Sequence, residues 1–298
     1  MAQTATPTSH LIFDRGLIRA RRRRAARLGP ATFLLDRVAA ELAERLAAVV
    51  RPFDLVLDLG TPGGALRARL TDVGSVGTVV STQTLPADAV PAPPLLVTAD
   101  EEMLPFRDAA FDLVVSALAL QFVNDLPGTL IQIRRALKPD GLFLAALLGG
   151  ETLTELRQSF AAAETELEGG LSPRIAPFAD LRDLGALLQR AGFALPVADV
   201  EEIRLLYASP LELLRDLRAA GETNALVLRQ RRPPPRALFP AALAALPVQE
   251  GRVCATLELA VLTGWAPAPG QPRPLRPGSG RIPLGEALAR PDREPDRG

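Results

Sequence analysis

The residues best suited to bind a charged ligand lie in the stretch DLGTPGG. Asp58 ends an apolar run, and Gly60, Gly63 and Gly64 follow it before a helical pattern begins. Glycine lets backbone N–H groups approach a ligand closely, and the N-terminus of a helix favours negative charge. Asp58 could accept a hydrogen bond from an ammonium group. The pattern therefore indicates a site for a small ligand that carries both charges.

Pro62 stands in the middle of this turn and limits it. Proline has no N–H group and fixes one backbone angle. Gly60, Gly63 and Gly64 still offer three donors, so we expect the turn to bind a ligand despite Pro62. By itself, a strand–glycine–helix turn is equally typical of a tight connection without a ligand.

Two further positions are expected to complete a nucleoside site. Gln83 ends the next strand, TVVSTQT, where an acid usually holds the ribose hydroxyls. A neutral amide forms weaker hydrogen bonds than a carboxylate, so we expect weakened affinity. Asp100 follows a third strand in TADEEMLPF, where it could accept from an adenine amino group. Glu101, beside it, is equally typical of a solvated acidic turn.

Three side chains are candidates for catalysis at the mouth of this site: Asp125, Glu151 and Tyr207. Asp125 could instead cap the helix that begins LPGTLIQI, which is the interpretation we favour. Glu151 could compensate a helix dipole, and Tyr207 could lie at the edge of the core. The catalytic residue is left open.

The counts of residue types exclude several chemistries. The chain has 298 residues with one cysteine, Cys254, and one histidine, His10. An intrachain disulfide, a Cys/His zinc cluster and a two-His, one-carboxylate iron site therefore cannot form, and a Ser-His-Asp triad would need His10. We expect no metal site. The formal net charge is zero, which argues against general nucleic-acid binding, and no apolar run is long enough to span a membrane.

The elements that must position these residues follow an alternating pattern. From residue 54, short runs that are apolar on both faces alternate with helical stretches, which predicts a parallel sheet covered on both sides. Strands are predicted over 54–59, 76–82, 94–100, 111–120, 142–148 and 252–267, and helices over 30–50, 64–70, 126–137, 177–192 and within 209–245.

Segments of distinct composition flank this core. Arg15, Arg19, residues 21–24 and Arg27 form a basic strip, typical of a solvated helix face or of a surface that docks an acidic partner. The last segment, PAPGQPRPLRPGSG, is too rich in Pro and Gly to pack a core. We divide the chain into a basic segment with an amphipathic helix (1–50), a nucleotide-binding core (51–207), a helical excursion with a closing strand (208–265) and a tail (266–298).

Together, VLDLGTPGG, the block from ADEEMLPF to ALKPDGLF, and GGETLTELRQSF resemble class I S-adenosylmethionine-dependent methyltransferases. With FDRGLIRARRRRAAR and SPRIAPFADLRDLGALLQRAGF, the chain over residues 11–288 resembles a narrower family, the methyltransferase-like complex I assembly factors of mitochondria and their bacterial relatives. A more distant resemblance is to the carboxyl methyltransferases that act on malonyl-carrier protein in biotin synthesis.

The resemblance implies a Rossmann-like α/β fold. Its sheet has seven mostly parallel strands with helices on both faces, N-terminal helices and a helical insertion before an antiparallel last strand. It also implies the cofactor S-adenosylmethionine. The positions that would bind it are Asp58, Gly60, Gly63, Gly64, Gln83 at the ribose, Asp100 and Glu101 near adenine, and Ser116, Ala117 and Leu118 under the methyl donor.

The function that the resemblance implies is methyltransferase-type action on a protein substrate, a complex I subunit, during assembly of that complex. Three alternatives stay open: hydroxylation of an arginine on such a subunit, with an oxidant from elsewhere; a non-catalytic assembly role with weakened cofactor binding; and carboxyl O-methylation of an acyl-carrier-protein substrate. Gln121 and Phe122 stand where relatives commonly have His and Trp, which removes a base near pH 7. We expect a cytoplasmic location in a bacterium, peripheral at the inner membrane.

Overall fold

The computed structural model describes residues 11–84 and 95–272, together with residues 278, 279, 283 and 285. His10 and most of the predicted tail lie outside these residues. The chain divides into two units, Met1–Pro267 and Ala268–Gly298, and the sheet with its helices belongs to the first.

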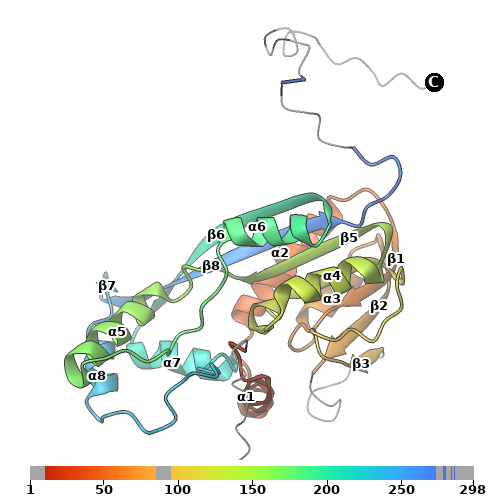
Figure 1. Ribbon diagram of the computed structural model, residues 1–298. Coiled ribbons are helices and arrows are strands. Elements are labelled where there is room, and N and C mark those ends of the chain that lie inside the picture. The colour runs from red at the N-terminus through yellow and green to blue at the C-terminus, as the bar shows by residue number, and fades with distance from the viewer. Residues whose placement is uncertain (1–10, 85–94, 273–277, 280–282, 284, 286–298) are drawn as a thin grey trace, which may run out of the picture. The chain divides into compact units, whose positions relative to one another are not determined.

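An eight-stranded sheet forms the centre of this unit, in the order β3-β2-β1-β4-β5-β8-β6, with β7 paired to β8 off this path. Neighbouring strands from β3 to β5 are parallel, whereas β8 is antiparallel to both β5 and β6 (Figure 1). The predicted mostly parallel sheet, closed by an antiparallel strand, is confirmed. The strands are β1 (Phe53–Asp58), β2 (Val76–Gln83), β3 (Leu96–Thr98), β4 (Phe111–Ala117), β5 (Leu137–Leu148), β6 (Ala194–Tyr207), β7 (Val248–Gln249) and β8 (Arg252–Trp265).

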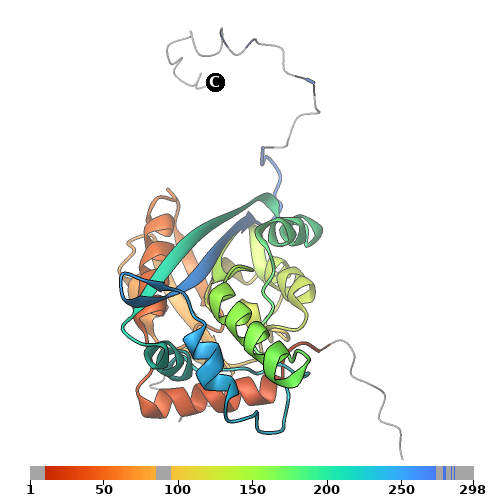
Figure 2. The same ribbon diagram turned by 90° about the vertical axis from the view of Figure 1, so that its left-hand side faces the viewer.

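Helices cover both faces of the sheet, because the central strands are apolar on both sides (Figure 2). Along β5, Leu144 and Ala146 belong to the core under α2 and α3, while Phe143 and Ala145 belong to the core under α4 and α6. The predicted helical insertion before the last strand consists of α7 and α8. The helices are α1 (Arg15–Leu28), α2 (Phe33–Ala47), α3 (Ala65–Thr71), α4 (Leu126–Ala136), α5 (Thr154–Glu168), α6 (Leu181–Arg190), α7 (Pro210–Ala219) and α8 (Leu238–Ala244).

Some boundaries differ from the sequence prediction. The helix predicted over 177–192 begins only at Leu181, because Asp180 caps it by accepting a hydrogen bond from the Asp183 N–H at 2.8 Å. Strand β5 begins at Leu137, directly after α4, and includes Asp140 with a φ of +61°. Strand β6 was not predicted, although its stretch ALPVADVEEIRLLY alternates apolar and polar residues over much of its length.

The register of the sheet places the predicted binding residues at one edge. Asp58, at the end of β1, pairs with Ser81 of β2 and with Val115 of β4. The glycine turn, the end of β2 and the end of β4 therefore lie next to one another, as the carboxyl ends of parallel strands do in ligand-binding folds. None of the described helices is long and apolar enough to cross a membrane.

Candidate functional site

A cavity lies at this carboxyl edge and is roofed by α1. Its floor comes from the ends of the parallel strands, and its cover comes from α1, the α1–α2 connection and the segment after α7. The residues that line it include Arg22, Leu34, Gly60, Pro62, Gly63, Gln83, Leu118, Gln121, Leu148 and Glu222. Of the predicted cofactor-binding residues, Gly60, Gly63, Gln83 and Leu118 line the cavity.

The glycine turn offers fewer free donors than expected. Gly60 and Gly63 both have a φ of +69°, which suits glycine. The Gly60 N–H already donates to the Thr82 Oγ1 at 2.9 Å. The expectation of three free donors is therefore wrong: of the three glycines of this turn, which all lie within the described residues, Gly63 and Gly64 have N–H groups without an acceptor. Both have open space, since a Cβ at either would meet no atom within 4 Å.

This geometry predicts different outcomes for two alanine substitutions. A Cβ at Gly60 would lie 2.6 Å from the Glu101 Oε1, and the φ of +69° adds strain, so Gly60→Ala should lower the free energy of unfolding by about 2–3 kcal/mol. Gly64→Ala meets open space at a negative φ and should change it by less than about 0.5 kcal/mol. Urea denaturation measures both. Equal losses would contradict the close approach of Glu101.

Buried oxygens without hydrogen-bond partners lie at the cavity wall and behind the glycine turn. Among the described residues, the Oε1 atoms of Gln83 and Gln121 and the Oδ1 atom of Asp58 have no partner. Gln121 holds its amide in place by donating from Nε2 to the Leu118 oxygen at 3.1 Å. An unsatisfied buried acceptor costs about 1–3 kcal/mol, so these atoms fit a ligand that carries several donors. A sulfonium nucleoside, with its hydroxyl, amino and ammonium groups, is such a ligand.

Asp58 lies behind the glycine turn, and the residue is almost fully buried at 2% exposure. Burial raises the pKa of Asp58 to about 6, while the hydroxyls of Thr61 and Ser81 oppose this rise. The Ser81 hydroxyl donates to the Asp58 Oδ2 at 3.2 Å. Asp58 does not line the cavity, so its contact with an ammonium group stays a prediction.

Asp100 and Glu101 are engaged by α1. Arg15 Nη2 lies 2.6 Å from the Asp100 Oδ1 and also pairs with Glu101, and Arg19 Nη1 lies 3.4 Å from the Asp100 Oδ2. Glu101 is 1% exposed, so the interpretation as a solvated turn is wrong. Neither acid lines the cavity, and the adenine contact stays a prediction. These pairs hold α1 over the strand ends.

The last residues of β4 and Leu118 after it form and support the floor of the cavity. Ser116 Oγ donates to the Leu59 oxygen at 2.8 Å, and the Ala117 N–H donates to the Thr61 Oγ1 at 3.0 Å. Leu118 has a φ of +51°, a strained conformation of the kind that clusters at functional sites. Leu118 alone of these three predicted residues faces the cavity.

The three catalytic candidates lie away from this cavity. Asp125 is exposed and caps α4 by accepting from the Gly128 N–H at 2.8 Å, which confirms the capping interpretation. Glu151 is exposed in a turn before α5, whose first-turn acid is Glu155, so the dipole interpretation of Glu151 is wrong. Tyr207 is half-buried, and burial together with Asp216 raises the pKa of its hydroxyl.

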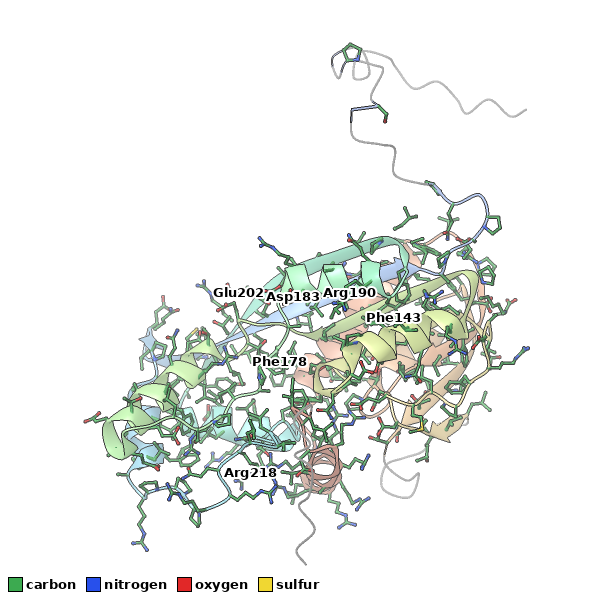
Figure 3. All side chains as sticks on the ribbon, in the orientation of Figure 1. Phe143, Phe178, Asp183, Arg190, Glu202 and Arg218 are labelled. Atoms are coloured by element: carbon green, nitrogen blue, oxygen red, sulfur yellow. The ribbon has the colours of Figure 1, made fainter. Side chains whose placement is uncertain are left out.

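A second cavity adjoins the first and was not foreseen. Its walls are mainly apolar, and Phe178 and Arg218, both labelled in Figure 3, belong to them. It shares Ala31, Leu34, Leu148, Ala220 and Glu222 with the first cavity. Its aromatic walls are Phe13, Phe33, Phe122, Phe160, Phe178, Tyr207 and Phe239.

Two residues that line these cavities, Arg22 and Glu222, were not predicted from the sequence as site residues. Arg22 was counted only within the basic strip, yet its Nη2 atom is buried without a hydrogen-bond partner and its side chain lines the first cavity. Glu222, in the stretch AAGETN, carries no local signal. Both depend on the packing of α1 against the segment after α7.

Comparison with known proteins places the chain among methyltransferase-like proteins. Residues 57–145 match a family model described as a methyltransferase domain. Over 297 residues the chain is 39% identical to mouse arginine-hydroxylase NDUFAF5, mitochondrial, covering 95% of this chain and 85% of that one. The human protein of the same name is 38% identical over 294 residues, with 95% and 85% covered. The malonyl-[acyl-carrier protein] O-methyltransferase of Laribacter hongkongensis is 41% identical over 177 residues, 59% of this chain and 58% of that one.

Solved structures support the fold. A candidate methyltransferase of Bacillus halodurans C-125 superposes with a TM-score of 0.51 at 19% identity, covering 77% of this chain and 99% of that one. The 1,6-didemethyltoxoflavin-N1-methyltransferase of Burkholderia thailandensis, which holds S-adenosylhomocysteine, gives a TM-score of 0.50 at 16% identity over 90% and 93%. These likenesses confirm the class I methyltransferase fold.

The comparisons decide several predictions made from the sequence. The predicted family and the predicted cofactor, S-adenosylmethionine, are confirmed. The predicted cytoplasmic location is wrong, because the relatives that match nearly the whole chain are mitochondrial proteins. This chain, with its methyltransferase domain, belongs to the family of the arginine-hydroxylase NDUFAF5 proteins.

Proposed function

We propose that this protein is an S-adenosylmethionine-dependent enzyme that modifies a side chain of a protein subunit of respiratory complex I during assembly of that complex. The observation that carries this proposal is the cavity at the carboxyl edge of the sheet, with its glycine turn and its unpartnered buried oxygens. The relatives that cover most of the chain are named for action on arginine, which supports a protein side chain as the substrate.

The lining residues, together with Gly64 beside them in the glycine turn, fit the cofactor group by group. The N–H groups of Gly63 and Gly64 and the unpartnered Arg22 Nη2 suit its carboxylate. The amide oxygens of Gln83 and Gln121 suit its hydroxyl and amino donors. When bound, S-adenosylmethionine supplies an electrophilic methyl group on a positively charged sulfur.

Other lining residues exclude water from the cavity and orient the ligand. Leu34, Leu118 and Leu148 form apolar walls of the cavity. Gln121 has an amide that does not titrate, so it orients a ligand without acting as a base. A proton acceptor, if the reaction needs one, must come from another lining residue.

A substitution at Gln83 is expected to change the affinity for the cofactor. Gln83→Glu has the same length and replaces a neutral acceptor with a charged one, so it should tighten binding of S-adenosylhomocysteine about fivefold. Gln189→Glu, on the exposed surface of α6, is the matched control and should change nothing. Isothermal titration calorimetry gives both dissociation constants. Unchanged affinity for Gln83→Glu would show that Gln83 does not contact the ribose.

The basic strip divides into two parts. Arg15 and Arg19 are used within the chain, whereas Arg23, Arg24 and Arg27 are exposed. The exposed part supports docking of an acidic surface on the protein substrate, since like charges held this close together favour a neutralising partner. In this proposal, the exposed arginines of α1 bind the protein substrate, and the face of α1 that lines the cavity covers the cofactor.

Mass spectrometry tests the proposed function. The purified protein is incubated with S-adenosylmethionine, complex I subunits and an acyl-carrier protein, with and without dioxygen and a two-electron reductant. Arginine-containing peptides are compared with those from a reaction that lacks the protein. Gain of one methyl group or of one oxygen atom on an arginine would support the proposal and distinguish methylation from hydroxylation. Methylation confined to carboxyl groups of a carrier protein would contradict it. So would cofactor binding with no modified subunit, which would indicate a non-catalytic assembly factor.

A further inference from the structure

Glu222 lies on the wall between the two cavities. It follows α7, where its N–H donates to the Leu217 oxygen at 2.9 Å. Next to it, Gly221 packs against α1 so closely that a Cβ there would lie 3.2 Å from the Arg22 Cα. Of the lining residues that the two cavities share, Glu222 is the only one that can carry a charge.

The carboxylate of Glu222 has no partner of its own. Its Oε2 atom is buried without a hydrogen bond, and no ion pair among the described residues includes it. Burial raises the pKa of Glu222 to about 7, and Arg22 opposes this rise. The site therefore contains an acid whose charge is poorly compensated, which favours a cation from outside.

The other acidic residue that lines the second cavity already has a neighbour. Asp216 interacts with the Tyr207 hydroxyl. Arg174, which also lines this cavity, pairs with Glu164 at 2.6 Å. The remaining charged lining residues, Arg21 and Arg218, are basic. Glu222 is thus the acid available to a ligand, and apolar walls lead to it.

This chemistry fits an arginine side chain. Its methylene stem can lie along apolar and aromatic walls, while its guanidinium ends in a planar set of donors that binds a carboxylate strongly. We propose that the second cavity admits the acceptor arginine of the protein substrate and that Glu222 binds its guanidinium beside the cofactor cavity. This inference rests on the proposed function and adds to it the residue that selects a cationic acceptor over a carboxylate.

The test measures binding of a blocked arginine amide to the full chain by calorimetry, with S-adenosylhomocysteine present. Glu222→Gln should weaken this binding at least about tenfold, because a charge-assisted pair becomes a neutral contact. Glu222→Asp should recover part of the loss. Glu166→Gln, at an exposed position on α5, is the matched control and should behave as the unmodified protein does.

Two further readouts separate binding from a structural role. Binding of the arginine probe should strengthen as the pH rises through about 7 in the unmodified protein, and it should lose this dependence in Glu222→Gln. Because Glu222 also lines the cofactor cavity, Glu222→Gln should weaken binding of S-adenosylhomocysteine somewhat, but several-fold less than it weakens binding of the arginine probe. A blocked glutamate amide should not bind.

Three results would overturn the inference: equal arginine binding by Glu222→Gln, tighter binding of the glutamate probe, or an equal loss of S-adenosylhomocysteine binding in Glu222→Gln. The last would make Glu222 a cofactor residue. Failure of the unmodified protein to bind S-adenosylhomocysteine would contradict the proposed function instead, so the two failures are distinguishable.

Discussion

Replacing Arg15 with glutamine is expected to lower the free energy of unfolding by about 3 kcal/mol, because it leaves a buried carboxylate without its cation. Arg15 is 14% exposed and Glu101 is 1% exposed, and they form a direct ion pair. Arg15 also donates from Nη1 to the Phe122 oxygen at 3.2 Å. The Arg15 side chain therefore joins α1 to two segments: the acidic turn after β3 and the segment after β4 that contains Phe122.

The same substitution should weaken cofactor binding. Glu101 lies against Gly60, so a Glu101 carboxylate that turns outward toward water would loosen the glycine turn, and α1 would lose its hold over the cavity. Arg23→Gln is the matched control, because Arg23 is exposed on the same helix. Urea denaturation and calorimetric titration with S-adenosylhomocysteine measure the two effects. Equal stability of the two variants would show that the Arg15 pair does not hold α1 in place.

Replacing Glu222 with glutamine is expected to stabilise the protein above about pH 7 while it abolishes selection of the acceptor. The folded-state pKa of Glu222 is raised from 4.5 to about 7, so the folded protein favours the protonated form. Ionisation then costs folding free energy, beginning near the unfolded pKa of 4.5 and reaching its full size above about pH 7. Glutamine resembles the protonated form and avoids this cost.

The expected gain for Glu222→Gln is about 2 kcal/mol well above neutrality, with no gain below the unfolded pKa. Urea denaturation at a series of pH values gives the difference between the variant and the unmodified protein. Glu166→Gln should show no such pH dependence, since Glu166 is exposed. A difference that does not change with pH would show that Glu222 is solvated in the folded protein. A stabilised but inactive variant would indicate a residue kept for function at a cost in stability.

The sheet and the glycine turn could be predicted from local sequence. Apolar runs such as DLVLDL and LFLAALL predict strands buried on both faces, and both lie in the central strands β1 and β5. The turn DLGTPGG predicts a glycine turn between a strand and a helix, and it lies between β1 and α3. These signals are local because they reflect backbone conformation and burial along one segment.

The cover of the site could not be predicted in the same way. The basic strip of α1 looks like a solvated face in sequence, but Arg15 and Arg22 turn inward because acidic residues far along the chain and the segment after α7 meet them. Glu222 has no pattern around it, and its role depends on two cavities that form only when α1, α7 and the strand ends pack together. These contacts join segments that are far apart in the chain, so no local sequence pattern indicates them.

The most direct test of the cofactor site is a crystal structure of the protein with S-adenosylhomocysteine. We expect the ligand in the cavity under α1, with its carboxylate against Gly63, its nucleoside against Gln83 and its sulfur facing the wall that contains Glu222. A ligand seated elsewhere, or a cavity that stays closed at saturating ligand because the side chains of α1 fill it, would contradict the proposed enzyme.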